Sequence, residues 1–121
     1  MLSCNKDKKQ HFQGTKIKDS VDYYSDKINN QTDNRKKIKL NNKLFQFVKQ
    51  SQNSSQKRKY LDLIINNCFY TSDWKTYYES SNILLNESKY SKDSVYLAKS
   101  LRYKGNYFYK NKNQNLKKVS L

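Results

Sequence analysis

The sequence contains no proline and only two glycines in 121 residues. Proline is the strongest helix breaker, because its ring fixes φ and its nitrogen has no hydrogen to donate, so its absence leaves helices uninterrupted. The sequence also has no strand-like alternation of apolar and polar residues and no Asn-Gly hairpin signal. These absences predict an all-α fold built from helical hairpins.

Residues that carry metal or catalytic chemistry are scarce. Cys4 and Cys68 are far apart and have no histidine beside them, which argues against a zinc site or a disulfide framework, and His11 is the only histidine. No Ser, His and Asp order, glycine-rich phosphate loop or inward-facing pair of carboxylates can be assembled. We therefore expect idle thiols, no metal, no cofactor and no autonomous enzyme.

Long hydrophobic runs are missing as well. No segment approaches the ~18 apolar residues that a membrane helix requires. The opening residues "MLSCNKDKK" place lysines directly after two apolar residues, so no signal-peptide core develops. These features predict an intracellular protein that does not enter a membrane, located in the cytoplasm, with the nucleus as an additional location.

Acidic residues are outnumbered: 10 Asp and Glu stand against 25 Lys and Arg, which gives a formal net charge of +15. The excess is larger in residues 1–59, with 15 basic and 5 acidic residues, than in the remainder, with 10 and 5. Such a charge favours acidic partners, whether nucleic acid, acidic protein tails or anionic lipid. Charge alone does not choose among these partners.

Two basic runs leave alternatives open. "RKKIK" at Arg35–Lys39 and "KRK" at Lys57–Lys59 fit solvated basic faces, or else nuclear-localisation and nucleic-acid patches. The eleven tyrosines also suggest RNA binding, since bases stack on aromatic rings. Helical spacing among apolar neighbours instead favours packing for a set of four tyrosines. They are Tyr77, Tyr78, Tyr107 and Tyr109.

The chain divides by its hydrophobic pattern. Residues 1–38 have scattered apolar side chains without a sustained period, which predicts a disordered or weakly helical basic arm. Residues 39–90 form a helical region. A first helix is expected at Lys39–Gln50, where apolar residues fall at i, i+4, i+7 and i+8, and helical spacing resumes in a second helix at Gln56–Tyr70.

A third helix is expected to begin after Thr71 or Ser72 as its N-cap, with Asp73 near the positive end of the helix dipole. Its apolar and aromatic face contains Trp74, Tyr77, Tyr78, Leu84 and Leu85. Ser91 or Ser94 is the expected cap of a fourth helix.

Gly105 lies inside this fourth helix, where a glycine costs about 1 kcal/mol relative to alanine and needs a reason. Leu101 lies one turn before it, and Phe108 and Tyr109 lie one turn after it. A small residue between large ones suits a second, antiparallel helix that approaches closely. We therefore predict that Leu101, Gly105, Phe108 and Tyr109 form a helix-packing motif.

The segment "AKSLRYKGNYFYK", from Ala98 to Lys110, resembles the first helix of a tetratricopeptide repeat (TPR). In that family the small residue lets the two helices of each hairpin pack closely. The resemblance implies a partial TPR-like hairpin over residues 91–121. The sequence departs from the family at Lys117, where an alanine is usual, and ends at Leu121, short of a repeat of about 34 residues.

The Lys-Gly-Asn run at Lys104–Asn106 resembles the repeats that open co-chaperone modules, which hold a partner's terminal carboxylate. The resemblance implies that Arg102 and Asn106 bind this carboxylate, for example at the C-terminus of a heat-shock chaperone. A spacing of i, i+4 places both residues on one helix face, and a guanidinium offers a forked pair of donors.

The order of helical region, Trp-containing segment and Lys-Gly-Asn repeat also resembles the N-terminal region of SET and MYND domain-containing lysine methyltransferases that carry TPRs. Neither the SET cofactor motifs nor the MYND zinc cysteines occur in these residues. The sequence thus predicts a protein-protein interaction module, a scaffold or co-chaperone-type adaptor, as an N-terminal fragment of a longer protein. The alternatives are a basic RNA- or ribonucleoprotein-binding protein and the non-catalytic part of such a methyltransferase.

Overall fold

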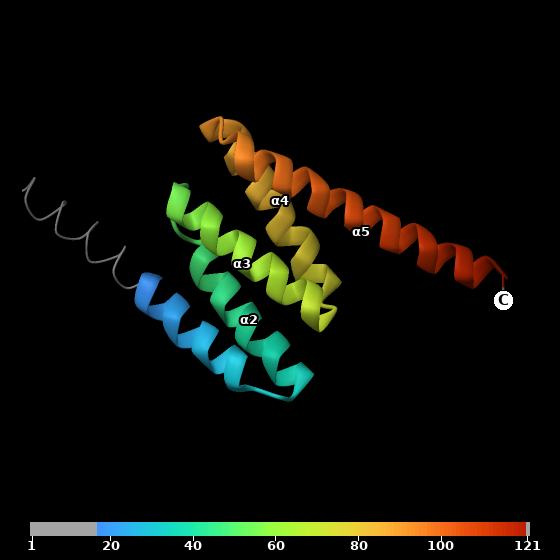
Figure 1. The fold of residues 1–121 in the computed structure, drawn as a ribbon, viewed down its shortest axis with the longest axis horizontal. Helices are drawn as coiled ribbons and strands as arrows, with labels where there is room; N and C mark the ends of the chain where they lie inside the picture. Colours follow the sequence, from blue (N-terminus) through green and yellow to red (C-terminus); the bar gives the residue numbers. More distant parts are fainter. Residues whose placement is uncertain (1–16, 121) are drawn as a thin grey trace, which may run out of the picture.

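A computed structural model describes residues 17–120, with side chains described for residues 17–112 (Figure 1). All the regular structure in this part of the chain is helical, which confirms the all-α prediction. A first helix covers residues 17–30. It is followed by α2 (Asn34–Lys49), α3 (Ser55–Thr71), α4 (Trp74–Ser91) and α5 (Ser94–Ser120).

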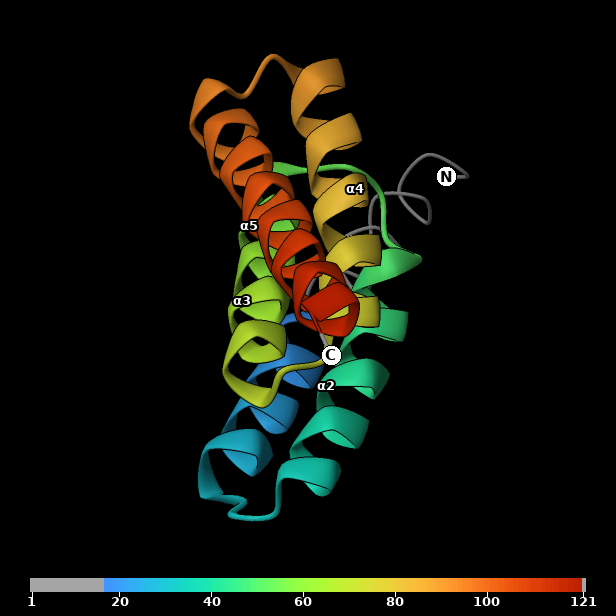
Figure 2. The same cartoon turned by 90° about the vertical axis from the view of Figure 1, so that its right-hand side faces the viewer.

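The helices form two layers (Figure 2). One layer holds α2 and α4, joined by a 2.6 Å hydrogen bond that Thr76 Oγ1 donates to Asn42 Oδ1. The other layer holds residues 17–30, α3 and α5, and a hydrogen bond from the Tyr103 hydroxyl to Asp62 Oδ1 joins α3 to α5. The chain therefore alternates between the layers as a series of antiparallel hairpins.

The core lies between the two layers and receives side chains from every described helix. In α2 the buried positions recur every three or four residues, as an amphipathic helix requires. The core cluster consists of Val21, Leu44, Phe45, Val48, Leu61, Ile64, Ile65, Cys68, Tyr77, Leu84 and Tyr103. Serines at 80, 81 and 88 of α4 are also buried, and such small side chains leave room for rings from neighbouring helices.

The turns before α4 and α5 share one geometry. Ser72 and Lys92 adopt the left-handed conformation, with φ of 63° and 54°, and each preceding helix ends in the paired hydrogen bonds of a Schellman motif. Asp73 then caps α4, and Asp93 Oδ1 accepts a 3.3 Å hydrogen bond from the Tyr96 N–H at the start of α5. The serine and threonine caps expected from the sequence were therefore wrong, since the aspartate after each left-handed residue is the cap.

The flexible arm expected over residues 1–38 is too long. Residues 17–30 are helical, with Val21 and Ile28 buried, and α2 begins at Asn34, where Asp33 accepts hydrogen bonds from the N–H groups of Arg35 and Lys36. The few apolar residues here fall on one helix face, and burial against α2 and α3 stabilises a segment that looked too polar to fold. The rest of the expected arm, residues 1–16, lies outside the described residues.

The last helix differs from the prediction in two ways. It continues to Ser120 and pairs with α4, so the second helix expected within residues 91–121 does not form. The predicted packing motif also faces outward. Leu101 is 54% exposed, Phe108 56% and Tyr109 68%, and a Cβ added at Gly105 would have nothing within 4 Å.

The buried side of α5 is formed instead by residues at i, i+4, i+7 and i+11, which are Tyr96, Ser100, Tyr103 and Tyr107. Aromatic rings and one serine, rather than the predicted helix-packing motif, fit against α3 and α4.

Candidate functional site

Arg102 and Asn106, the two residues predicted to bind a carboxylate, lie one turn apart on α5, and both are exposed. They are close to Tyr77 of α4, which is only 1% exposed. Burial raises the pKa of Tyr77, whereas the Asn106 side chain and the positive charge of Arg102 oppose that rise. The buried Tyr77 hydroxyl has no hydrogen-bond partner among the described residues.

Helix α3 lies beside these residues and contributes Asp62. Its carboxylate accepts a hydrogen bond from the Tyr103 hydroxyl and lies 3.5 Å from Lys99 Nζ. Burial and the neighbouring Asp62 raise the pKa of Tyr103 to about 12, with Asn66 and Arg102 acting in the opposite direction. The Asp62 carboxylate therefore has a neutral donor, Tyr103, and a cation, Lys99, beside it.

Aromatic side chains extend the site towards the start of α4. The Trp74 ring makes edge contacts with Phe69, at 6.0 Å between centroids, and with Tyr77, at 5.2 Å. Lys110 Nζ lies 4.3 Å from the centroid of Trp74, within the range of a cation–π interaction. Tyr70 is 82% exposed next to Phe69.

We call this surface the α3–α5 face. It consists of Asp62, Asn66, Phe69, Trp74, Lys99, Arg102, Asn106 and Lys110, with Tyr77 below. Three cations, two amides and one paired carboxylate make it a positive, donor-rich surface with an aromatic end. Such a surface can bind an anion by hydrogen bonds and an apolar side chain beside it.

Sequence reasoning found two of these residues and missed the rest. Lys99, Arg102, Asn106 and Lys110 recur at i, i+3, i+7 and i+11, a helical spacing that the sequence alone displays. The contributions from α3 and α4 had no such signal, because only the tertiary fold brings them to α5.

Two residues of the basic run at Lys57–Lys59, namely Lys57 and Arg58, have a different role from either one predicted, whereas Lys59 is exposed. Lys57 Nζ lies 2.5 Å from Glu87 Oε1 and also donates to the carbonyl of Ser51, and Arg58 Nε donates to Asp93 Oδ2 at 2.8 Å. Both basic side chains are buried. They are neither a solvated face nor a nucleic-acid patch, but ion pairs that connect α3 to the end of α4 and the turn that follows it.

The four tyrosines expected to pack behave unequally. Tyr77 is buried, and Tyr78 and Tyr107 are partly buried, with ring centroids 4.7 Å apart across α4 and α5. Tyr109 is exposed, so the packing prediction was wrong at that position.

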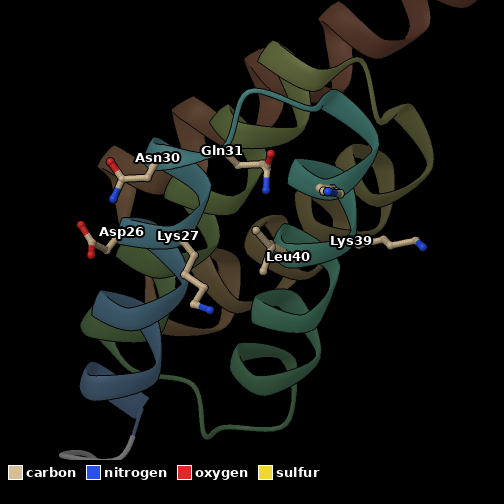
Figure 3. A pocket seen from close by; sticks show the side chains of 7 residues that line it. Asp26, Lys27, Asn30, Gln31, Lys39 and Leu40 are labelled. Carbon is tan, nitrogen blue, oxygen red and sulfur yellow. The ribbon is translucent and has the colours of Figure 1, made fainter.

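A hollow lies between residues 17–30 and α2 (Figure 3). It is lined by Asp26, Lys27, Asn30, Gln31, Lys36, Lys39 and Leu40. Figure 3 shows the Lys27 side chain extending into the space between the helices, whereas Lys39 points away from it. Gln31 Oε1 already accepts hydrogen bonds from the N–H groups of Thr32 and Asp33, so it stabilises the turn. The hollow gathers no set of groups aimed at one ligand.

Among the residues that the structure describes, no three His, Cys, Asp or Glu side chains gather as a metal site would require. Cys68 is a free, buried thiol that accepts a hydrogen bond from Asn41, and burial raises its pKa. Cys4 and His11 lie outside the described residues. In the same part of the chain, every helix is too short or too polar to cross a membrane.

Comparisons with known proteins found no matching family model, no matching curated protein and no matching solved structure. The resemblances to TPR proteins and to SET and MYND domain-containing proteins therefore stay predictions.

Proposed function

We propose that this chain is a non-catalytic protein-interaction scaffold, and that its α3–α5 face binds the carboxylate end of an acidic peptide from a partner protein. The observation that carries the proposal is the pair of exposed donors, Arg102 and Asn106, one turn apart and close to the hydroxyl of Tyr77, which has no partner among the described residues. A guanidinium binds both oxygens of a carboxylate, and an amide donor one turn away fixes its orientation.

The surroundings of this pair favour an acidic ligand. Lys99 and Lys110 lie on the same side of α5, and the nearby Asp62 is engaged by Tyr103 and Lys99. An acidic residue upstream of the carboxylate can therefore approach without meeting an unpaired negative charge. The Phe69 and Trp74 rings offer contact to an apolar side chain of the peptide.

A heat-shock chaperone tail ending in Glu-Glu-Val-Asp has this chemistry, and we propose it as the first ligand to test. Because the site is exposed and solvent screens its charges, one such face gives weak binding, of order 0.1–1 mM. A scaffold of this kind gains affinity when several faces bind one partner. A role as part of a SET and MYND methyltransferase remains a narrower form of the same proposal.

The test compares this peptide with its C-terminally amidated form, by calorimetry or fluorescence anisotropy at moderate salt. Amidation removes the terminal charge and leaves the bulk, so we expect severalfold weaker binding. Arg102→Ala should remove the difference between the two forms. Lys112→Ala deletes the same charge from another side of α5 and should preserve it.

Equal binding of the two forms would contradict the proposal. The RNA-binding alternative predicts a different pattern, namely binding to arbitrary RNA that weakens steeply with salt and survives Arg102→Ala and Asn106→Ala.

A further inference from the structure

A second surface of α5 faces solvent on another side of the helix. Positions 98, 101, 105, 108 and 112 follow the alternating spacing of three and four residues that forms the seam of a coiled coil. All five are exposed. We call this surface the α5 seam; its residues are Ala98, Leu101, Gly105, Phe108 and Lys112.

The α5 seam alternates small and large side chains. Leu101 and Phe108 are each more than half exposed, and the small residues Ala98 and Gly105 lie between and beside them. Because a Cβ at Gly105 would have nothing within 4 Å, packing among the described residues does not require this glycine. A glycine between two large apolar residues forms a gap that a side chain of another helix can enter.

The charge of α5 indicates which kind of helix can pack against the α5 seam. From Ser94 to Ser120 the helix contains six lysines and Arg102 and no acidic residue. Arg102 and Lys104 occupy the positions that flank a coiled-coil seam between Leu101 and Gly105. A second copy of the chain would oppose like charges at these positions, whereas acidic flanking residues on a different helix would pair with them.

The α5 helix also offers the length that such a partner needs. Its C-terminal end extends past the other helices in Figure 1, beyond the contacts that Tyr107 and Lys110 make with α4. A partner helix can therefore lie along it without displacing α4.

We propose that the α5 seam binds an amphipathic helix of a partner protein, with apolar residues at three-four spacing and acidic residues on both flanks, which crosses α5 at Gly105. This interaction uses a surface distinct from the α3–α5 face and does not depend on the carboxylate site. Arg102 lies at the border of both surfaces, so Gly105 is the position that separates them experimentally.

The experiment uses the full chain and a designed helical peptide of about 21 residues, three heptads with leucine at the seam positions and glutamate at the flanks. Binding is measured by fluorescence anisotropy at about 0.15 M salt, where diffuse attraction is screened beyond ~8 Å. A second peptide with lysine at the flanks tests the charge requirement. We expect the glutamate peptide to bind at least tenfold more tightly.

The decisive variant is Gly105→Leu, which fills the gap and leaves the charge unchanged. The site has space for the new side chain, so the thermal midpoint should not fall, yet binding of the glutamate peptide should weaken at least tenfold. Asn86→Leu adds the same side chain at an exposed, uncharged position of α4 and should keep binding within twofold of wild type.

Two outcomes would overturn the proposal. One is equal binding by Gly105→Leu and the wild-type chain, which would show that the peptide is held by net charge alone. The other is a dimer of the wild-type chain in sedimentation that Gly105→Leu converts to a monomer, because the seam would then bind a second copy.

Discussion

The two sides of α5 differ in a way that side-chain hydrophobicity does not predict. Ser100 is fully buried, whereas its neighbour Leu101 is 54% exposed. The buried side is built from tyrosines and a serine, and the α5 seam carries leucine and phenylalanine. The fit to α3 and α4, rather than the apolar character of each residue, therefore determines which side packs.

On the buried side, Tyr103 has a contact for its ring and a partner for its hydroxyl. The Tyr103 ring packs edge-on against Tyr77 at 6.1 Å, and its hydroxyl donates to Asp62 across to α3. Ser100 Oγ returns a hydrogen bond to the carbonyl of Leu97 at 2.9 Å, so its polar atom is satisfied inside the contact. A leucine at the same position would bring bulk without these partners.

The largest difference in the free energy of unfolding should come from truncating one side chain on each side of α5. Tyr103→Ala removes a buried ring and its hydrogen bond, and we expect a loss of about 3–5 kcal/mol in the free energy of unfolding. Leu101→Ala acts at an exposed position and should change it by about 0.5 kcal/mol or less. Urea unfolding followed by circular dichroism measures both, and equal losses would mean that the two sides were assigned wrongly.

The next contrast enlarges the small residue on each side. Ser100→Leu inserts bulk into a closed contact and should cost about 1–3 kcal/mol. Gly105→Leu meets open space and should cost nothing, since leucine is also a better helix former. A lower thermal midpoint for Gly105→Leu than for Ser100→Leu would restore the packing role that the sequence suggested for this glycine.

The sequence predicts the elements of this fold better than their contacts. Helical periodicity and the absence of proline identify α3 and α4 to within a few residues, because each has a continuous amphipathic pattern. The same reasoning placed residues 17–30 in a disordered or weakly helical arm, whereas they form a helix in which Val21 and Ile28 are buried.

The candidate site shows the same difference between what local spacing predicts and what only tertiary contacts determine. Arg102 and Asn106 share one side of α5, and the local spacing was enough to predict this. The positions of Asp62 and Trp74 next to them depend on how α3 and α4 pack, which no local pattern reveals. Lys57 shows the opposite failure. Its run of like charges predicts an exposed side chain, whereas the side chain is buried in an ion pair with Glu87, thirty residues away in sequence.

A third prediction uses pH to sharpen the comparison between the two sides. The folded pKa of Tyr103, about 12, lies above the unfolded value near 10, so the stability that its neutral phenol contributes is complete below about pH 10. This contribution is lost as the pH rises through about 12. Tyr103→Phe cannot ionise, so the urea midpoint of the wild-type chain should fall more steeply than that of Tyr103→Phe over this window.

The pH test is read as the difference between the two chains, because lysines and other tyrosines titrate in both. At pH 7 the wild-type chain should be more stable, since it retains the hydrogen bond to Asp62. Parallel alkaline profiles for the two chains would indicate that the Tyr103 hydroxyl is not held against a carboxylate.

The smallest effect concerns the cost of the glycine itself. Gly105→Ala should raise the free energy of unfolding by about 0.5–1 kcal/mol, because alanine reduces backbone freedom in the unfolded chain and has room in the helix. The reciprocal change, Ala98→Gly, lies on the same seam and should lower stability by a similar amount. The double variant should then return to the wild-type midpoint, since the two positions do not touch a common buried side chain.

A gain in stability from Gly105→Ala, combined with weaker binding of the acidic helical peptide, would show that the glycine serves the α5 seam and not the folded core. A loss of stability would mean that some contact of α5 already uses this gap.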